Sequence, residues 1–316
     1  MENVLYLDGT CGISGDMFVA SLLSLGGDEN ILKEALNSLR LEDEFSVEIS
    51  QKKSYSILGT DFNVILKHNE HEHLENAHCE HHHEHEHHNH EHHHTLHHIH
   101  RHLKDINEII DNAKISDNAK HIAKNIFLIV AKAESKAHGC KVEEVHFHEV
   151  GAIDSIVDII SASVLIANLN IKKCIITNLN EGQGFITCAH GDLPIPVPAV
   201  LNILEDYKIP FSITDAKSEM ITPTGIAILA SLNPVFSLPK NFTILRQGIG
   251  LGKRDFGRPN ILRALFIKEE LNDSLYDTNN NIIIVETNIN NDTGENLSFA
   301  MEKLFEARAK DVHIVP

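Results

Sequence analysis

A histidine-rich segment interrupts this chain of 316 residues and constrains its fold more than any other feature. Between His68 and His102 lie 18 of the 24 histidines, interspersed with glutamates. A segment this polar cannot bury the apolar surface that folding requires. The core must therefore form from the residues on either side, and we predict that residues 68–102 are a flexible insertion between ordered elements.

Strand and helix signals lie on both sides of this insertion. Before it, NVLYLD predicts a buried strand, GTCGISG a small-residue loop, DMFVASLLSLG a helix that ends at Gly26, and FSVEIS and DFNVILK two strands around a turn at Gly59. After it we predict helices at 103–113, at 117–138 with Asp117 as N-cap and Gly139 as the stop, and at 152–169, 199–206 and 226–232. Further strands are predicted at 174–180, 242–248 and 261–267.

This order of elements predicts an α+β fold, with mixed α/β layers and a partly antiparallel sheet. The polar stretch LNDSLYDTNNN predicts a linker at 271–281. Residues 1–270 are therefore predicted to form an N-terminal domain. Residues 282–316 hold one predicted strand, IIIVETNI, one predicted helix, ENLSFAMEKLFEAR, and DVHIVP, which resembles a strand cut short. We predict that they are the incomplete start of a second α+β domain, because so few residues cannot easily bury a core.

Composition excludes several classes of protein. The formal net charge is −18, so the surface should repel the phosphate backbone of nucleic acids. No apolar run reaches the roughly 18 residues that a membrane span needs, and the N-terminus lacks a secretory pattern. The five cysteines are an odd number without a CxxC pair, which indicates reduced thiols in a cytoplasmic protein.

The insertion itself predicts metal binding. Neutral imidazole is a good ligand for Ni²⁺, Zn²⁺ and Cu²⁺, and the neighbouring glutamates attract cations. So dense a tract offers many overlapping ligand sets, which suits metal gathering more than a fixed catalytic geometry. The alternative is a solvated linker without a role. The candidate ligands are His81, His83, His85, His87 and His90.

A second candidate metal site lies in EEVHFHEVGAIDSIVDI. His146 and His148 alternate, so they share one face of an extended segment, and Asp154 and Asp158 share one face of a helix. These four side chains could converge on a divalent cation. The alternative is that the histidines fill a core and Asp154 complements a helix dipole.

Two glycine-rich loops and one further histidine complete the candidates. In LDGTCGISGD, backbone amides around Gly12, Ser14 and Gly15 predict an anion site, and Asp8 and Asp16 could hold a cation beside it, although a tight turn explains the glycines nearly as well. In CAHGDLPIPVP, a proline-rigid loop would hold His190 in place. In GIGLGKRDFGRPNILR, the cations predict a phosphate or carboxylate ligand, with a solvated loop as the alternative; they are Lys253, Arg254, Arg258 and Arg263.

Four of these motifs, together with TPTG at 222–225, resemble a known family. LYLDGTCGISGDM, VHFHEVGAIDSIVDI, AHGDLPIPVPA, TPTG and GIGLGKRDFGRPN stand in the order seen in the nickel-insertion proteins (cyclometallases) of the lactate racemase nickel-pincer cofactor. The histidine-rich insertion sits in the same place, and the resemblance covers nearly the whole chain.

The resemblance implies a lyase that inserts Ni²⁺ into pyridinium-3,5-bisthiocarboxylic acid mononucleotide and depends on CTP and Mn²⁺. It implies that residues 1–270 are the nickel-handling domain and that the C-terminal domain carries the nucleotide site. His146, His148 or His190 would take nickel or remove a ring proton, while the basic loop would grip the substrate's phosphate. The implied partners are the precursor, a complementing C-terminal half and a lactate racemase-like acceptor enzyme; homo-oligomerisation is left open.

Two other functions are open on the sequence alone. A nickel store or metallochaperone without catalysis would explain the histidine tract but not the ordered motifs elsewhere. A metal-dependent hydrolase would use His146, His148, Asp154 and Asp158 and would turn over phosphate esters without the precursor.

Overall fold

The computed structural model describes residues 3–67, 101–145, 153–188, 191–270, 285–290 and 292–314. Contacts within the chain divide it into two compact units, Met1–Glu270 and Leu271–Pro316. Each unit is described by itself below, and the interpretation of the two units as domains stays a prediction.

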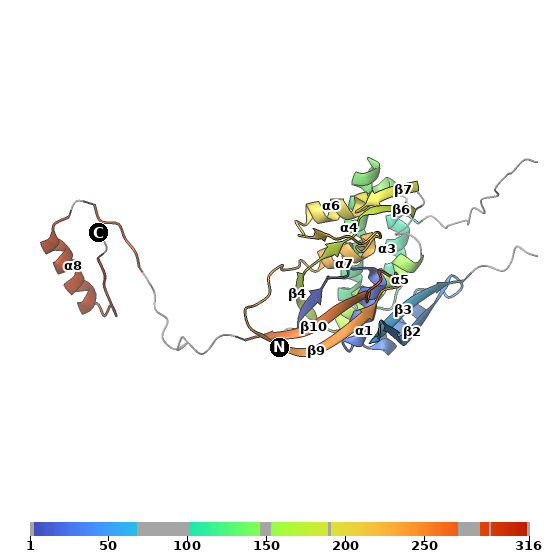
Figure 1. Cartoon of the computed structure of the whole chain (residues 1–316), viewed down its shortest axis with the longest axis horizontal. Coiled ribbons are helices and arrows are strands. Elements are labelled where there is room, and N and C mark those ends of the chain that lie inside the picture. The colour runs from blue at the N-terminus through green and yellow to red at the C-terminus, as the bar shows by residue number, and fades with distance from the viewer. Residues whose placement is uncertain are drawn as a thin grey trace, which may run out of the picture. The chain divides into compact units, whose positions relative to one another are not determined.

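A mixed six-stranded sheet organises the first unit (Figure 1). Its strand order is β2-β3-β9-β10-β1-β4. Strand β1, next to the edge strand β4, pairs parallel with β4 and antiparallel with β10, so the predicted α+β class with a partly antiparallel sheet is confirmed. The strands are β1 (Asn3–Asp8), β2 (Phe45–Ser54), β3 (Ile57–Leu66), β4 (Ile171–Thr177), β9 (Phe242–Leu251) and β10 (Ile261–Glu269).

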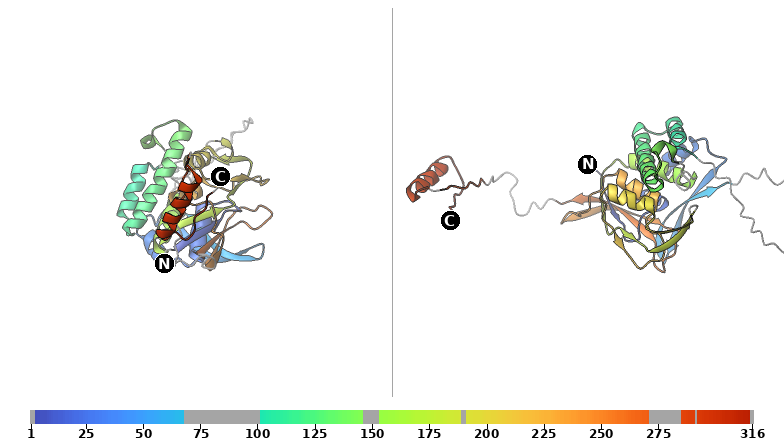
Figure 2. Two further views of the ribbon diagram at one scale, coloured as in Figure 1. Left: turned by 90° about the vertical axis from the view of Figure 1, so that its left-hand side faces the viewer. Right: turned by 90° about the horizontal axis from the view of Figure 1, so that it is seen from above.

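Helices pack on this sheet in two layers, seen from two further directions in Figure 2. Helix α1 (Gly15–Ser24) lies against β3, β9 and β10, and α5 (Ile153–Asn168) lies against both α1 and β3. Outside them, α4 (Asp117–His138) packs on α5 and on α7 (Pro223–Ser231). The other helices in the described part of this unit are α2 (Glu29–Asn37), α3 (Leu103–Asn112) and α6 (Pro198–Asp206), and a short 3-10 turn, η2 (Val142–Glu144), follows α4.

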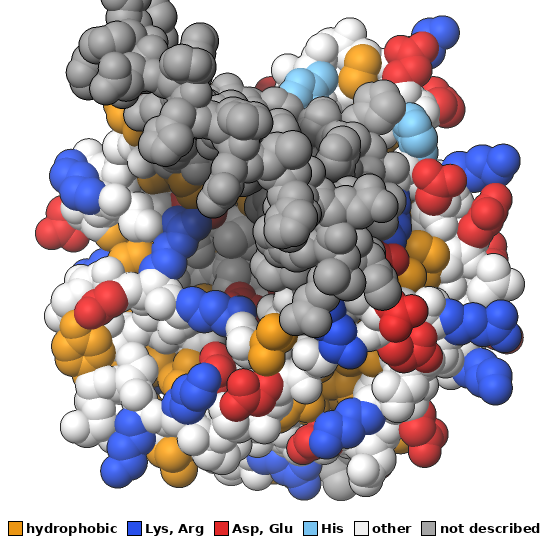
Figure 3. Space-filling model, turned by 90° about the vertical axis from the view of Figure 1, so that its right-hand side faces the viewer, with side chains coloured by type: hydrophobic (Ala, Val, Ile, Leu, Met, Phe, Trp, Pro, Cys, Tyr) orange, Lys and Arg blue, Asp and Glu red, His pale blue; other side chains and the backbone are white. Residues whose placement is uncertain are grey.

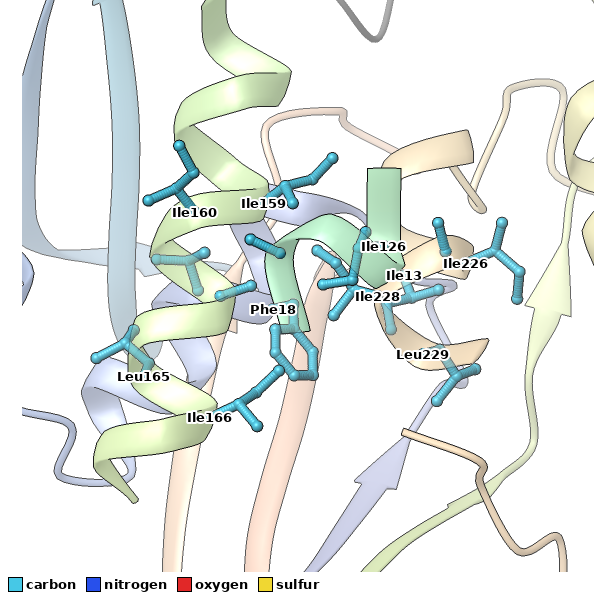
Figure 4. Close-up of a cluster of buried hydrophobic side chains, with 14 of the residues drawn as sticks. Ile13, Phe18, Ile126, Ile159, Ile160, Leu165, Ile166, Ile226, Ile228 and Leu229 are labelled. Carbon is cyan, nitrogen blue, oxygen red and sulfur yellow. The ribbon is translucent and has the colours of Figure 1, made fainter. Parts of the chain in front are cut away.

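The hydrophobic core lies where α1, α4, α5 and α7 meet (Figure 4). Phe18 of α1 is fully buried in it, beside side chains from the other three helices. Helix α5 is apolar around almost its whole circumference because it is enclosed by other elements, as an all-round hydrophobic helix must be. The apolar stretch that predicted this helix therefore reflects burial on several sides.

Two small sheets extend the first unit near the proline-rich passage. Strand β5 (Asn180–Glu181) pairs with β8 (Ser212–Ile213), and β6 (Gly184–Cys188) forms an antiparallel pair with β7 (Gly191–Ile195). Neither pair was predicted from the sequence. The β6–β7 pair includes Pro194, which an edge position tolerates because its missing N–H is not needed there.

Two local predictions, the turn at Gly59 and the N-cap at Asp117, need correction. The β2–β3 turn lies at Tyr55–Ser56, both with positive φ, and Gly59 lies inside β3, where a Cβ would come within 2.6 Å of the Leu251 side chain. The N-cap of α4 is Ser116 rather than Asp117, because the Ser116 hydroxyl accepts the Ala119 N–H.

The predicted flexible insertion ends earlier than residue 102. Arg101 is buried and donates to Glu44 at 2.6 Å, and His102 is the N-cap of α3. Residues 68–100 lie outside the described residues, so the remainder of that prediction is untested.

The second unit contains the predicted helix as α8 (Gly294–Glu306), and the Thr293 hydroxyl caps its start by accepting the Asn296 N–H. The predicted strand at 282–289 is not found in its described part, since residues 285–290 form no regular element. Residues 311–314 of DVHIVP likewise form no strand. A strand needs a neighbour for its backbone groups, and the described residues of this unit supply none.

Acidic and basic side chains are interspersed over the face shown in Figure 3. No helix within the described ranges is both long enough and apolar enough to cross a membrane.

Candidate functional site

The glycine loop between β1 and α1 is packed tightly against the segment before α7. Gly12 has φ +79°, and a Cβ at this position would lie 2.1 Å from the Met220 carbonyl oxygen. Ile13 exchanges backbone hydrogen bonds with this segment, donating to the Met220 carbonyl at 3.0 Å and accepting the Thr222 N–H at 3.0 Å. The glycine is therefore required for close approach of two backbones. The Gly12 amide donates to the Gly9 carbonyl, and anion binding by the loop stays a prediction.

Gly15 brings helix α1 against the first turns of α5. A Cβ on Gly15 would lie 2.5 Å from Oδ2 of Asp158 and 2.9 Å from the Thr224 methyl. The absence of a side chain thus lets the Asp158 carboxylate approach the N-terminus of α1. The Asp16 backbone hydrogen-bonds to Asp158 there, as a helix N-terminus does with an anion.

Asp16 and Asp158 form the centre of what we call the carboxylate cluster, completed by Asp154. Asp16 Oδ1 accepts the Ser14 hydroxyl at 2.5 Å and the Met17 N–H at 2.9 Å. Asp154, one turn before Asp158 on α5, is exposed and accepts the Ser155 N–H. The structure thus brings together Ser14, Gly15, Asp16 and Asp158 from two of the predicted motifs.

The surroundings of Asp158 only partly compensate the negative charge of its carboxylate. Its Oδ1 is buried and has no hydrogen-bond partner among the described residues. Burial raises the pKa of Asp158 well above its usual range, and the charges of Asp16 and Asp154 raise it further, whereas Lys253 and the Asp16 backbone hydrogen bond act in the opposite direction. A carboxylate with one buried oxygen that lacks a hydrogen-bond partner is a chemically suitable ligand for a divalent cation.

Asp8 is placed differently from the other candidate metal ligands. It lies at the end of β1, 5% exposed, and its Oδ1 accepts the Thr10 hydroxyl at 2.5 Å and the Thr10 N–H at 3.2 Å. Arg263, opposite it on β10, forms an ion pair with Oδ2. Burial acts to raise the pKa of Asp8, but the Thr10 and Arg263 contacts outweigh burial and lower it. This carboxylate is therefore already satisfied by the protein.

A basic groove lies between the β2–β3 hairpin and the loop that joins β9 to β10. Its volume is about 480 Å³. Tyr55, Asp61 and Asp255 line it together with five cations, which are Lys52, Lys53, Lys253, Arg254 and Arg258. Three of the four predicted cations are thus gathered in one groove, and the hairpin adds two lysines. The fourth, Arg263, pairs with Asp8 instead.

The basic groove and the carboxylate cluster meet at Lys253. Its Nζ is 3.7 Å from Asp16 Oδ2. Arg254 is held by the acidic segment before α7, since it donates to Oε2 of Glu219 at 3.1 Å and to the Glu219 carbonyl at 3.0 Å. A candidate anion-binding surface and a candidate cation site therefore lie side by side.

A second, polar pocket of about 260 Å³ shares Arg254 with the basic groove. It is also lined by Asp154, Thr187, Cys188 and Thr222. Asp154 follows soon after the histidine motif at 146–148, and Cys188 is two residues before His190. The described residues that adjoin both histidine motifs therefore reach the same pocket.

The histidines themselves lie outside the described residues. This applies to His146, His148 and His190 and to the insertion ligands His81, His83, His85, His87 and His90. Within the described ranges, no group of three or more His, Cys, Asp or Glu side chains is placed to hold a metal ion. The metal-binding and catalytic roles of these residues stay predictions.

Four residues around the site were missed in the sequence. Lys52 and Lys53 carried a signal, since two adjacent lysines precede a hairpin turn, but nothing in the sequence places that hairpin beside residues 252–260. Nothing in the sequence marked Glu181 and Glu219 as residues of the site. Glu181 is buried and accepts the N–H groups of Gly182 at 2.7 Å and Met220 at 2.6 Å, which anchors the segment that contacts the glycine loop.

Comparison with known proteins agrees with the motif order. The family model described as "Nickel insertion protein" matches residues 5–316. The chain belongs to the nickel insertion protein family. No solved structure matches this member of the family.

Several curated relatives are similar over the whole of this family member. A pyridinium-3,5-bisthiocarboxylic acid mononucleotide nickel insertion protein of Alkaliphilus metalliredigens is 45% identical over 100% of this chain and 75% of its own length. Proteins with the same name from Clostridium acetobutylicum and Lactiplantibacillus plantarum are 44% and 41% identical, each over 99% of this chain, and the matches cover 74% and 73% of those proteins.

Proposed function

We propose that this protein inserts nickel into pyridinium-3,5-bisthiocarboxylic acid mononucleotide to form the nickel-pincer cofactor. Membership of the nickel insertion protein family and the names of its relatives support this substrate. The observation that carries the proposal is the contact between Lys253 and Asp16, which joins a basic groove to a carboxylate cluster. A reaction that unites a metal cation with an anionic nucleotide needs both surfaces next to each other.

The chemistry requires a transfer of nickel from hard to soft ligands. Two thiocarboxylate sulfurs and one ring carbon of the precursor become nickel ligands, so a carbon–nickel bond forms as the ring carbon loses a proton. Oxygen and nitrogen ligands of the protein are harder than sulfur and can release nickel to the thiocarboxylates. A base must take the proton, and His146, His148 and His190 are the proposed candidates.

The reaction makes the protein a nickel chelatase, a cyclometallase of the lyase class. CTP and Mn²⁺ are the co-substrate and metal expected from the family resemblance, and CTP would supply the free energy of a phosphoanhydride bond. Oxygen ligands suit Mn²⁺, and the unpartnered Asp158 Oδ1 fits a hard cation of this kind, so Asp16 and Asp158 would hold it. We further propose a cytoplasmic setting and a lactate racemase-like acceptor enzyme, with a complementing C-terminal half where the chain alone does not use CTP.

The direct test is reconstitution. The purified chain is mixed with the precursor, Ni²⁺, Mn²⁺ and CTP, with and without a complementing C-terminal half, and the nickel-bound product is sought by mass. Single alanine substitutions at His146, His148 and Asp154 should each abolish insertion while the far-ultraviolet circular dichroism is retained. Normal insertion by all three variants would exclude this site.

Deletion of residues 69–100 separates the proposal from a nickel store. An insertase should keep its activity at high nickel concentration and lose it mainly when nickel is scarce, because the tract only gathers the ion. A store should lose its function entirely with the tract. The deletion stops before Arg101, which is bound to Glu44 in the folded unit.

A further inference from the structure

The β2–β3 hairpin is fastened to the basic loop at its tip. Tyr55 and Ser56 have φ of +47° and +71°, so the two-residue turn has the type I′ backbone that matches the twist of paired strands. The Tyr55 hydroxyl donates to Asp255 Oδ1 at 2.7 Å, and the same oxygen accepts the Gly257 N–H at 2.8 Å. This contact joins residues 200 positions apart and forms one end of the groove.

The five cations of the groove are not equivalent. Lys52 is 2.6 Å from Asp61, Lys253 is 3.7 Å from Asp16, and Arg254 is 3.1 Å from Glu219. Each of these three charges is already balanced by a carboxylate. Lys53 and Arg258 are exposed, line the same groove, and have no ion pair or side-chain hydrogen bond with any described residue. The cations of the groove that have no carboxylate partner are therefore Lys53, from the hairpin, and Arg258, from the loop. They face one lining carboxylate, Asp255, which is held by a hydroxyl and an amide rather than by a cation.

Two unpaired cations on opposite walls of a groove suit a phosphate monoester. Such a group carries between one and two negative charges at pH 7 and accepts several charge-assisted hydrogen bonds, which a lysine and an arginine can both donate. The groove volume of about 480 Å³ lies within the range of small-ligand sites. Because Arg254 lines both cavities, a phosphate in the groove would leave the rest of the nucleotide to extend towards the second pocket, where Asp154 lies.

We propose that Lys53 and Arg258 bind the phosphate monoester of the nucleotide substrate, and that the β2–β3 hairpin thereby makes the protein selective for the phosphorylated precursor. This inference rests on the proposed function, of which it specifies the recognition step. It adds a residue of the hairpin to a site that the sequence placed only in the loop at 252–260.

The test compares the mononucleotide precursor with its dephosphorylated riboside. The Lys53→Ala variant should raise KM for the mononucleotide by about 10-fold, the value of one charge-assisted hydrogen bond at an exposed site, and should leave kcat nearly unchanged. It should not change kcat/KM for the riboside. The matched control is Lys172→Ala, an exposed lysine of β4 at the opposite edge of the sheet, which should leave both substrates unaffected.

The CTP arm separates two sources of the same phosphoryl chemistry. If Lys53→Ala raises KM for CTP and not for the precursor, the groove belongs to the triphosphate and the inference is overturned. An equal loss with mononucleotide and riboside would also overturn it, because the phosphate would then not be what Lys53 recognises.

Direct binding keeps this inference apart from the proposed function. Titration of the full chain with the mononucleotide alone, followed by calorimetry, should show weaker binding by Lys53→Ala and by Arg258→Ala. If wild type binds the mononucleotide in this way but inserts no nickel in any reconstitution, the proposed function fails and the phosphate site stands. If wild type inserts nickel and both variants bind as wild type does, only the phosphate site fails.

Discussion

The carboxylate cluster and the basic groove touch at Lys253 but are built in opposite ways. Asp16 and Asp158 lie at the packed junction of α1 and α5, where the packing leaves no room for a side chain at position 15, which is a glycine. Lys53 and Arg258 project from a hairpin and a loop into solvent. One region holds Asp16 and Asp158 half-buried between two packed helices, and the other presents its charges at the surface.

The difference has an electrostatic consequence. Burial opposes the ionised form of Asp158 and raises its pKa, so this carboxylate favours either a proton or a metal ion as its partner. The exposed cations of the groove remain in contact with solvent, so their charged forms carry little desolvation cost. The buried region is thus suited to hold a cation in fixed geometry, and the exposed region to attract and release an anion.

The largest expected effect comes from removing the buried charge. Asp158→Asn keeps the shape of the side chain but removes a ligand, so nickel insertion should fall by at least about 100-fold. The thermal stability of the metal-free protein at pH 7 should not fall, because the ionised carboxylate is the form that burial disfavours. The control is Asp117→Asn in the exposed first turn of α4, which should insert nickel at the wild-type rate. Wild-type insertion by Asp158→Asn would remove this residue from the site.

The glycine loop beside the carboxylate cluster should be more tightly packed than the loop of the basic groove, and one glycine substitution in each loop compares them. Gly12→Ala combines a positive φ with a Cβ 2.1 Å from the Met220 carbonyl, and should lower the free energy of unfolding by about 3 kcal/mol. Gly257→Ala in the groove loop also has a positive φ, +70°, but its Cβ would meet nothing within 4 Å, so the loss should be about 1 kcal/mol. Urea unfolding measures both. Equal losses would show that the glycine loop is not the more tightly packed of the two.

The Tyr55–Asp255 contact should affect substrate binding in the basic groove and have little effect on the stability of the core. Tyr55→Phe removes the hydroxyl that donates to Asp255, so the hairpin wall becomes less fixed and KM for the mononucleotide should rise about threefold. Steady-state kinetics measures this change, and kcat should stay within error of wild type. Tyr207→Phe, a tyrosine that follows α6, is the control and should leave KM unchanged. A fall in kcat with constant KM for Tyr55→Phe would contradict a purely positioning role.

The smallest expected effect is a pH dependence of stability. It comes from Glu181, the buried carboxylate that accepts the Met220 N–H. Burial raises the pKa of Glu181, although the amides of Met220, Gly182 and Ile221 act to lower it. Because the folded pKa lies above the unfolded one, the contribution of Glu181 to stability is complete below the unfolded pKa and is lost as pH rises through the folded pKa. The Tm of wild type relative to Glu181→Gln should therefore fall by about 2 °C as pH rises from 4 to 8. A rise of the wild-type Tm relative to the Tm of Glu181→Gln over this pH range would contradict the raised pKa.

Most elements of the first unit could be predicted because their signals are local. The apolar stretch 153–168 produced a helix, and Gly139, with φ +65°, ended α4 as predicted. The failures were also local ambiguities. Ser116 and Asp117 are both good N-caps, and only the hydrogen bond to Ala119 distinguishes them. Gly59 looked like a turn residue, but its lack of a side chain serves the approach of Leu251 from β9.

The candidate site was predictable only in parts. The residue types of Asp16, Asp158 and Arg258 indicated cation and anion chemistry from the sequence. Their neighbours could not be read from it, because Lys253 and Asp16 are far apart in the chain and meet only after β9 and α1 have packed together. The partners that neutralise Arg254 and Lys52 were likewise invisible, and these decide which cations remain to bind a ligand.

The sequence by itself determined the chemical inventory and the family: ordered motifs, glycines at fixed places, and a histidine tract that no core can absorb. The tertiary structure alone decided that the Oδ1 atom of Asp158 is buried without a hydrogen-bond partner among the described residues, that Asp8 is satisfied by Arg263, and that a hairpin lysine shares a groove with the basic loop. The reason is physical. Side-chain type is a local property of the chain, whereas burial, pairing and pKa depend on which distant segments pack around each group.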